Sequence, residues 1–596
     1  MNIVLEIKKY FKIFLDILGR NIFLILIFTV LSTFAEAFGI MMVLPLLEAF
    51  SDTPINEKNI FMVNIIRNIF AEHINLDEKT FVLLILLFIC GLFVLKGILY
   101  FVSLAISAYM RGKLLEKLKC GIMYELSNLK YSEFVKNNSG YYTNILNEQI
   151  NRSLIAFQKL MLLCGNIFSA IIFTGCAFYT SFKFGLLALA SGLFVIIVLK
   201  GLSNYVRMLS RKTALLNGSL ANMIIQYVQN FKYVRSTSQY GFFSSHLNPL
   251  IKKLASYEIK TAVSAALTQS VREPIAVIVI ILSLLTSIFY FNDNISNLIV
   301  SLALFYKCFT SVFRIQSTWQ NVLEYIGSVE LVRNESIRYS NNIEKNSFLK
   351  LDDISRIEFI DVSFRYENTT QFILNNIKFS ISKSNTIGFV GKSGCGKSTL
   401  IDLISLILNP SSGSILINGI KSHQLDKNFL RSKIGYVTQE NVIFDGTIKE
   451  NIVMDNPMNL SLTELDSKIT NVCADASILE FIKTLPCGFE TRVGDRGINL
   501  SGGQKQRIFI ARELFRSPEL LILDEATSSL DSKSERNIQN SVDALKGKLT
   551  IILIAHRLST LKNCDLIYVI NEGQIAEFGS YETLSRDTKS LFYSLT

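Results

Sequence analysis

The sequence predicts two structural parts of different kinds: a polytopic α-helical membrane domain with six transmembrane helices, followed by a soluble α/β domain. Half of the 596 residues are hydrophobic and only 18% are charged, and the mean hydropathy of +0.36 is high for a soluble protein. Six long apolar stretches occupy the first 330 residues, and after Ile357 short strand-like runs alternate with helical ones. The predicted domains are therefore residues 1–330 and 355–596, joined by a polar linker at residues 331–354.

Each apolar stretch is long enough to span a bilayer, because a helix of about 20 mostly apolar residues crosses about 30 Å of hydrocarbon. Residues 181–184 and 292–295 have the composition of tight turns, which would pair the third stretch with the fourth and the fifth with the sixth. The predicted spans are residues 21–47, 80–108, 151–181, 183–208, 265–291 and 296–325.

The distribution of positive charge predicts the orientation of these spans. Two connections, residues 109–150 and 205–262, are rich in Lys and Arg, whereas the segments assigned to the other side are poorer in them. Cytoplasmic loops carry such an excess, so both connections and both chain ends are expected in the cytoplasm. Each connection has a long helical pattern, which predicts two cytosolic coupling extensions that turn around at residues 131–142 and 231–247. The same bias accounts for the net charge of +11 without a nucleic-acid partner.

The N-terminal segment has an amphipathic pattern of its own. Residues 3–18 carry apolar side chains at helical spacing with lysines among them, and no small-residue cleavage site of a secretory signal follows. This pattern predicts an amphipathic helix on the membrane surface. The lipid bilayer is thus an expected partner of this helix as well as of the six spans.

A phosphate-binding loop is predicted in the soluble domain. The segment 387–400, IGFVGKSGCGKSTL, reads as a strand, a G-x-x-x-x-G-K-S loop and a helix. Its glycines allow backbone N–H groups to surround phosphates, while Lys397 reaches the β- and γ-phosphates and the Ser398 hydroxyl binds Mg²⁺. A glycine-rich turn without a ligand is the alternative for this motif alone. The expected nucleotide contacts here are Gly391, Lys392, Ser393, Gly394, Cys395, Gly396, Lys397, Ser398 and Thr399.

Two further motifs in the soluble domain suit phosphate chemistry. The apolar strand 520–523 ends in Asp524 and Glu525, where the first carboxylate can hold Mg²⁺ and the second can orient or deprotonate water. The segment 500–504 is LSGGQ at the start of a helix, where free N–H groups and the helix dipole favour an anion. The phosphate-binding loop already surrounds the phosphates of one nucleotide, so the sequence gives no sign that the LSGGQ segment contacts those phosphates as well.

The LSGGQ segment resembles the signature motif of the ABC ATPases letter for letter, and residues 355–585 as a whole resemble such an ATPase. Further motifs of the ABC ATPases follow in the family's order along the chain. Two residues differ from the family pattern: Asp495 stands where glutamate is commoner, and Ser529 stands where alanine is commoner. The resemblance implies a cytosolic α/β P-loop ABC ATPase domain with ATP and Mg²⁺ as cofactors. It further implies that Tyr366 stacks on adenine, that Ser501, Gly502, Gly503 and Gln504 bind nucleotide, that Ser398, Gln439 and Asp524 hold Mg²⁺, and that Glu525, His556 and Gln439 are catalytic.

The single copy of each motif bears on assembly. In ABC ATPases the signature of one copy closes over the nucleotide of another, so one phosphate-binding loop and one signature imply a second chain. A homodimer with two competent sites is expected, and a heterodimer stays open. Six spans followed by the ATPase on one chain resemble the exporter half-transporters (type IV), which implies ATP hydrolysis coupled to export across the bacterial inner membrane.

The membrane domain resembles, more loosely, the bacterial flippases of lipid-linked oligosaccharides, in scattered patches at residues 32–52, 59–73 and 230–233. This resemblance implies an amphipathic, phosphate-bearing lipid as substrate. Lys96, Arg272 and Lys307 occur where such flippases carry arginines that meet a pyrophosphate; snorkelling to the interface is the alternative for the first two. A peptide, bacteriocin or multidrug exporter is the alternative function. An ATPase acting on DNA, or a membrane-tethered regulator, conflicts with six spans.

Overall fold

A computed structural model of the chain divides into two compact units, each described here by itself: Met1–Leu129 with Glu133–Ile343, and Lys130–Ser132 with Glu344–Thr596. The division falls inside the predicted linker, and residues 331–341 of that linker continue the last helix of the first unit. The structure describes the whole chain except residues 1, 44–77, 181–185, 187–189, 191–199, 272, 276, 279–280, 282–284, 286–294, 368, 456–459, 525–531, 556–557, 588 and 596.

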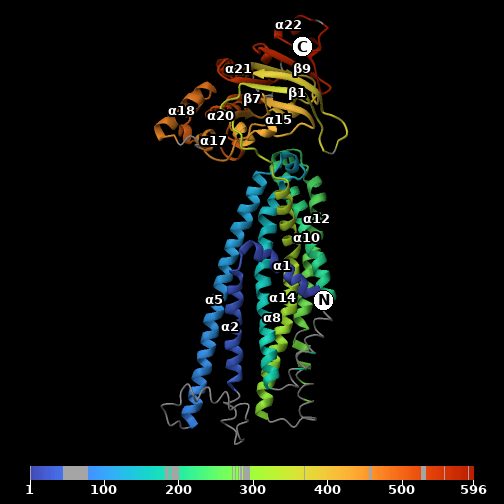
Figure 1. Ribbon diagram of the computed structural model, residues 1–596, viewed down its shortest axis with the longest axis vertical. Coiled ribbons are helices and arrows are strands. Elements are labelled where there is room, and N and C mark those ends of the chain that lie inside the picture. The colour runs from blue at the N-terminus through green and yellow to red at the C-terminus, as the bar shows by residue number, and fades with distance from the viewer. Residues whose placement is uncertain are drawn as a thin grey trace. The chain divides into compact units, whose positions relative to one another are not determined.

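The first unit is a bundle of long helices that run side by side (Figure 1). Each predicted span overlaps one of them, although much of the stretches 183–208 and 265–291 lies outside the described residues. So do the predicted turn 181–184 and all of the predicted turn 292–295 except Ile295, which begins the last helix. Three described helices, Ile22–Met41, Val82–Ser127 and Ser139–Tyr179, are long and apolar enough to cross a membrane. The long helices are α2 (Ile22–Met41), α5 (Glu78–Ser127), α8 (Ile150–Thr180), α10 (Lys200–Gln229), α12 (Tyr240–Ser270) and α14 (Ile295–Asn341).

These helices are longer than a bilayer requires. Helix α5 alone has 50 residues, or about 75 Å at 1.5 Å per residue, against about 30 Å of hydrocarbon. Short helices occupy the predicted turnarounds: α6 (Tyr131–Phe134) and α7 (Ser139–Asn144) in the first, and α11 (Phe231–Ser236) in the second. A π-helical turn, Ile145–Gln149, joins α7 to α8.

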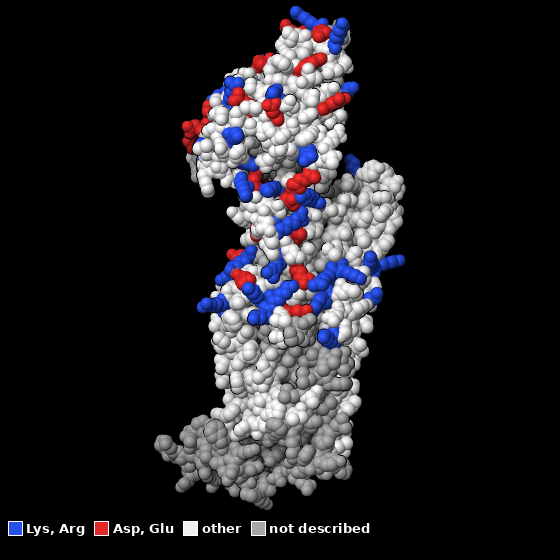
Figure 2. Space-filling view, turned by 45° about the vertical axis from the view of Figure 1, so that its right-hand side comes forward, with Lys and Arg blue, Asp and Glu red and all other residues white. Residues whose placement is uncertain are grey.

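Figure 2 shows Lys and Arg side chains gathered in a band across the helices of this unit. On one side of the band, below it in the view, the described side chains on the face shown are almost entirely uncharged. This distribution is the one expected where helices enter a bilayer from the cytoplasmic side.

The N-terminal helix α1 (Asn2–Leu18) confirms the predicted helix, but its apolar face packs on protein. The helix crosses the bundle (Figure 1), and Tyr10, Ile13 and Phe14 are buried in a core shared with the long helices. The Tyr10 hydroxyl donates to Glu330 Oε1 at 2.9 Å. The amphipathic pattern therefore reports contact with the bundle for this part of the helix, while Val4 near its start stays exposed.

The second unit confirms the α/β pattern and contains two sheets. The strands of the antiparallel sheet, in spatial order, are β2 (Leu374–Ser382), β1 (Arg356–Phe364), β4 (Ser412–Ile417) and β5 (Ile420–Lys421). Those of the larger sheet are β10 (Gln574–Gly579), β9 (Leu566–Asn571), β3 (Thr386–Val390), β8 (Thr550–Ile554), β7 (Leu520–Asp524) and β6 (Ile434–Val437). Its helices are α15 (Lys397–Ile404), α16 (Lys427–Ser432), α17 (Ile448–Val453), α18 (Leu462–Asp475), α19 (Leu479–Thr484), α20 (Gly502–Phe515), α21 (Ser532–Leu545) and α22 (Tyr581–Arg586).

The larger sheet positions the functional loops. All of its strand pairs are parallel except β10 with β9, and every residue of β3, β7 and β8 is buried. Parallel strands that are buried on both faces read as continuous apolar runs, as these do. Because the carboxyl ends of parallel strands meet at one edge of a sheet, the segments that follow β3, β6, β7 and β8 begin at the same edge.

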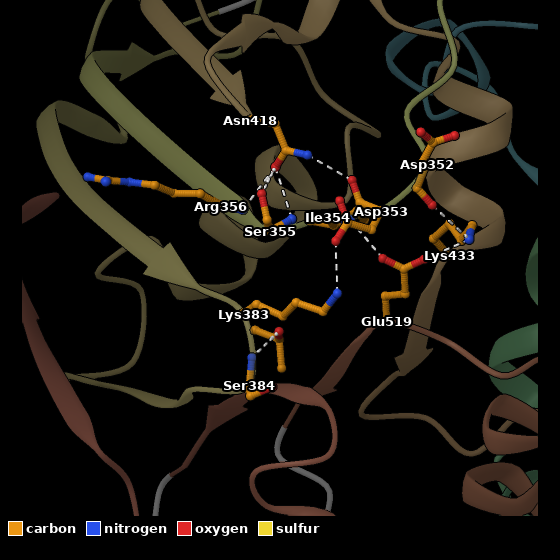
Figure 3. Close-up of polar contacts among 11 residues, drawn as sticks. Asp352, Asp353, Ile354, Ser355, Arg356, Lys383, Ser384, Asn418, Lys433 and Glu519 are labelled. Atoms are coloured by element: carbon orange, nitrogen blue, oxygen red, sulfur yellow. Dashed lines mark hydrogen bonds and ion pairs between the residues drawn. The ribbon is translucent and has the colours of Figure 1, made fainter.

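The chain enters this unit along a segment that is fixed to both sheets (Figure 3). Asn418, in the turn after β4, accepts hydrogen bonds at Oδ1 from the backbone N–H groups of Ser355 and Arg356, both at 2.9 Å. The next residue back, Ile354, donates its N–H to Glu519 Oε2 at 2.7 Å, and Glu519 also accepts from Lys433 Nζ at 2.6 Å. Glu519 and Lys433 lie directly before β7 and β6, so the entering chain joins the two sheets.

Candidate nucleotide site and membrane cavity

The phosphate-binding loop follows β3 and is built by backbone constraints. A Cβ at Gly391 would lie 2.2 Å from the Ile570 carbonyl oxygen, so only glycine fits there. Gly394 and Gly396 have φ values of +82° and +103°, a region that L side chains rarely adopt. The loop ends at Gly396, the N-cap of α15, where free N–H groups and the helix dipole favour an anion.

Lys397 is held inside the loop that it is expected to serve. The residue is only 6% exposed, and its ammonium donates to the carbonyl oxygens of Gly391 at 2.8 Å and Lys392 at 3.0 Å. A buried ammonium surrounded by loop carbonyls is a positive charge already placed for a phosphate. The first turn of α15 continues with Ser398, which is exposed, and Thr399, which is buried.

The structure brings Tyr366 to this loop. Its hydroxyl lies 3.4 Å from Thr399 Oγ1, and its ring packs edge-on against Phe364 at the end of β1. The ring remains 43% exposed, so a face is available for a base to stack on. The stacking of Tyr366 on adenine, which the family resemblance implies, stays a prediction.

Asp524 forms the centre of an acidic group at the end of β7. It is 7% exposed, and the Tyr436 hydroxyl lies 3.5 Å from its Oδ2. Burial, and then the charge of Asp524, raises the pKa of Asp402 on α15 to about 6; the same two causes raise the pKa of Tyr436. Burial is the larger cause of both shifts; a cation beside Asp524 would offset the part that comes from its negative charge.

These oxygen donors fit Mg²⁺. The Asp524 carboxylate, the Ser398 hydroxyl and the Gln439 amide are hard oxygen ligands of the kind that Mg²⁺ prefers. Among the described residues, no three His, Cys, Asp or Glu side chains are grouped so as to hold a metal ion by themselves. The protein would therefore supply a few ligands and leave the rest to phosphate oxygens and water, as is usual for Mg²⁺ at nucleotides.

The remaining predicted catalytic residues are described unequally. Gln439 follows β6 and is exposed at the edge where the phosphate-binding loop begins. Glu525 and His556 lie outside the described residues. The strands that precede them, β7 and β8, end at Asp524 and Ile554 on that same edge.

The signature segment forms the start of α20. Ser501 is the N-cap and forms a reciprocal capping box with Gln504: Ser501 N donates to Gln504 Oε1 at 2.8 Å, and Gln504 N donates to Ser501 Oγ at 3.3 Å. Ser501 and Gly502 are exposed, whereas Gly503 is buried. Within the part of the chain that the structure describes, no hydrogen bond joins residues 501–504 to the phosphate-binding loop of the same chain.

In the first unit, two of the predicted substrate residues meet at one carboxylate that the sequence analysis did not single out. Glu36 on α2 accepts from Lys307 Nζ on α14 at 2.7 Å and pairs with Lys96 Nζ on α5 at 2.9 Å. The carboxylate offsets the cost of placing these lysines in apolar helices. Arg272 lies outside the described residues.

Glu36 and Lys96 line a cavity of about 450 Å³ among α2, α5, α8 and α14. Two further cations, Lys159 on α8 and Arg314 on α14, line it as well, together with hydroxyl groups such as that of Ser169. Among the described residues, neither Lys159 nor Arg314 has an ion-pair partner. Lys307 was singled out because an ionisable residue inside a membrane span usually faces a cavity or a partner. The same rule, applied to every ionisable residue of the predicted spans, would have found Glu36, Lys159 and Arg314.

Comparison with known proteins places this arrangement in a family. Residues 374–528 match the ABC transporter family. The heterocyst differentiation ATP-binding protein HepA of Nostoc sp. is 32% identical over 474 residues, which cover 79% of this chain and 77% of that protein. An ATP-dependent lipid A-core flippase of Haemophilus influenzae is 30% identical over 510 residues, 83% of this chain and 84% of the relative.

A solved structure shows the same fold over nearly the whole chain. It is the structure of a bacterial Atm1-family ABC exporter with ATP bound, which superposes with a TM-score of 0.78 at 23% sequence identity. The match covers 97% of this chain and 98% of the other. Both the helical bundle and the two-sheet unit described above therefore occur together in an exporter fold.

Proposed function

The chain belongs to the ABC transporter family, as an exporter half-transporter that couples ATP hydrolysis to transport, and on this premise we propose which substrate it moves. The substrate is an amphipathic lipid with phosphate in its headgroup, a lipid-linked oligosaccharide or another glycolipid. The transporter flips it across the bacterial inner membrane, with the ATPase domain in the cytoplasm.

The observation that carries the proposal is the charge of the membrane cavity. Its described lining contains the cations Lys96, Lys159 and Arg314 and one carboxylate, Glu36, while Lys307 reaches it through Glu36. Cations in a membrane-spanning bundle are expensive and are retained where they meet a partner or a substrate. A phosphate headgroup supplies the missing negative charge, and hydroxyl and apolar side chains in the same lining suit a glycan joined to a lipid.

The name of one relative agrees with lipid transport, and the name of another points to drug export. The Haemophilus protein is named a lipid A-core flippase, while a Staphylococcus aureus relative, 45% identical over 229 residues, is named a putative multidrug exporter. A cavity with an excess of positive charge disfavours a cationic drug. A peptide, bacteriocin or drug substrate is therefore the alternative outcome of the test below.

The ATPase unit drives transport with its own residues as follows. Lys397 and the N–H groups of the loop neutralise the phosphates. Ser398, Asp524 and Gln439 would hold Mg²⁺, which would supply further charge neutralisation when bound. We assign Glu525 to orient or deprotonate the attacking water and His556 to contact the γ-phosphate. Ser501 and Gly502 are exposed, and we assign the segment 501–504 to the nucleotide of a second copy, which makes the working unit a homodimer.

The test is ATP hydrolysis by the purified dimer in phosphatidylcholine proteoliposomes doped with one candidate at a time. The candidates are a polyprenyl-diphosphate oligosaccharide, the matching uncharged polyprenol, a cationic drug and a peptide. Stimulation by the diphosphate lipid alone, with flipping of that lipid, is the expected result. Stimulation by drug or peptide with no response to the diphosphate lipid would overturn the proposed substrate.

A further inference from the structure

Glu36 stands out within the cavity because it is the one carboxylate among the described residues that line it. Its two oxygens are used separately: Oε1 binds Lys307 on α14 and Oε2 binds Lys96 on α5. One carboxylate thus occupies two ammonium groups from two other helices. A phosphate has several anionic oxygens and can bind the same two ammonium groups.

We propose that Glu36 is a built-in competitor of the substrate phosphate and sets which headgroups the transporter accepts. The proposal rests on the proposed function, since it assumes that Lys96 and Lys307 bind the headgroup. In the resting cavity Glu36 holds both lysines. A headgroup binds the two lysines only when their ion pairs with Glu36 break. The cost of breaking these ion pairs lowers the affinity of the cavity for every anion.

The charge balance gives this competition its selectivity. Two ammonium groups and one carboxylate leave a single positive charge at the cluster. A neutral or cationic headgroup gains nothing there, and a singly charged phosphodiester replaces the carboxylate with a similar charge. A diphosphate brings more charge than the carboxylate it displaces, so it competes best. Glu36 therefore favours diphosphate lipids over ordinary phospholipids, which surround the protein in large excess.

Removal of the carboxylate should leave the helix packing in place. Helices α2 and α5 are also joined by Ser32 Oγ, which donates to the Lys96 carbonyl at 3.1 Å, and by the Thr29 and Ser103 hydroxyls at 2.7 Å. Between α2 and α14, the bond from Lys307 to Glu36 is the one hydrogen bond found within the described part of the chain. A neutral glutamine of the same size at position 36 thus keeps most of the polar contacts of α2.

The test compares Glu36→Gln with wild type in phosphatidylcholine nanodiscs that contain polyprenyl diphosphate, the singly charged phosphodiester phosphatidylglycerol, or uncharged polyprenol. For Glu36→Gln, the concentration of polyprenyl diphosphate that gives half-maximal ATPase stimulation should fall about tenfold. Phosphatidylglycerol should hardly stimulate wild type but should stimulate Glu36→Gln, and polyprenol should have no effect on either protein. Glu330→Gln is the matched control, because it removes the carboxylate that pairs with Arg211 and Tyr10 outside the cavity, and it should respond as wild type does.

A second measurement separates this inference from the proposed function. With Mg-ADP saturating the nucleotide sites, inorganic diphosphate should raise the unfolding temperature of Glu36→Gln more than that of wild type. If wild type responds to polyprenyl diphosphate but Glu36→Gln needs as much or more of it, Glu36 is not a competitor and the proposed function stands. If neither protein responds to the lipid but diphosphate stabilises Glu36→Gln selectively, the proposed substrate is wrong and the competition remains. Equal responses in both measurements overturn the inference, and Glu36→Asp, which keeps the charge, repeats the comparison if Glu36→Gln does not fold.

Discussion

The two binding sites of this chain are built in opposite ways. The phosphate-binding loop of the nucleotide site is made of neighbours in sequence: glycines with positive φ, a helix N-terminus and a lysine that bonds to its own loop. The membrane cavity is made of side chains from four helices, in which Glu36 and Lys307 are 271 positions apart. Backbone geometry tolerates almost no substitution, whereas a charge can be supplied from several positions. The first site can therefore be recognised as a motif, and the second only by its summed charge.

The largest expected effect tests the backbone-built site. Lys397→Ala should lower ATP turnover by at least about 100-fold, because the phosphates lose a desolvated cation that the loop holds in place. Steady-state ATPase activity and nucleotide affinity of the purified dimer measure it. Lys421→Ala, which removes an exposed lysine of β5, is the matched control and should leave turnover unchanged. Comparable turnover in both variants would contradict the assignment of Lys397.

Glu525→Gln should separate binding from chemistry. The amide keeps the size of the side chain but cannot accept a proton from water, so ATP should bind normally and hydrolysis should fall by about 100-fold or more. Nucleotide binding and single-turnover hydrolysis measure the two steps. Near-normal hydrolysis would remove Glu525 as the catalytic base.

Ser501 should act on the nucleotide of the partner chain. In a mixed dimer with Lys397→Ala in one chain and Ser501→Arg in the other, both lesions fall in one composite site and about half of the activity should remain. The control dimer carries both changes in one chain beside a wild-type partner, which places one lesion in each site and should be inactive. The opposite ranking of the two dimers would mean that each chain uses its own signature.

The contrast between a loop of sequence neighbours and a cavity of distant side chains also explains which features could be predicted from the sequence. The loop 391–398, the apolar strands of the larger sheet and the short helices at the turnarounds were predictable, because local spacing dictates them. The partner of Lys307 was not, because helical periodicity tells which residues share a face but not which helices meet. The apolar face of α1 was assigned to the bilayer, whereas it packs on the helices of the bundle. An amphipathic pattern shows that a face is covered, but it does not show whether lipid or a neighbouring helix covers it.

Lys307 tests the charge-built site with a smaller effect. Lys307→Ala should reduce substrate-stimulated ATPase and flipping about tenfold, while Lys307→Arg keeps the charge and should be mild. Basal ATP hydrolysis should survive in both, because the nucleotide site belongs to the other unit. The same measurements on Lys96→Ala and Arg272→Ala show how much each of these cations contributes to transport when Lys307 is intact. Normal transport by all three alanine variants would make these charges interfacial anchors and remove the residue-level support for a phosphate headgroup.

A charge cluster that neither site uses lies where the predicted linker joins the ATPase unit, and its expected effect is on stability. Glu344 accepts from Arg431 at 2.6 and 2.9 Å and from Lys427 Nζ at 3.2 Å, and the Lys427 side chain is only 5% exposed. Burial alone would raise the pKa of Glu344, but the hydrogen bonds and charges of Arg431 and Lys427 hold it below its usual value.

Because the pKa of Glu344 is depressed on folding, its contribution to stability is present above the unfolded value of about 4.3 and is lost as the pH falls through the folded pKa. Glu344→Gln should therefore destabilise the ATPase unit by about 1–3 kcal/mol at pH 7, and the difference from wild type should shrink below about pH 4. Hydrogen exchange of the α16 amides in the full-length dimer, followed from pH 7 downwards, measures this locally. Glu480→Gln, which removes one partner of an exposed pair with Lys483, is the control and should change stability by less than about 0.5 kcal/mol. A difference between Glu344→Gln and wild type that stays constant down to pH 3 would mean that packing of the side chain, and not its charge, fixes the linker to this unit.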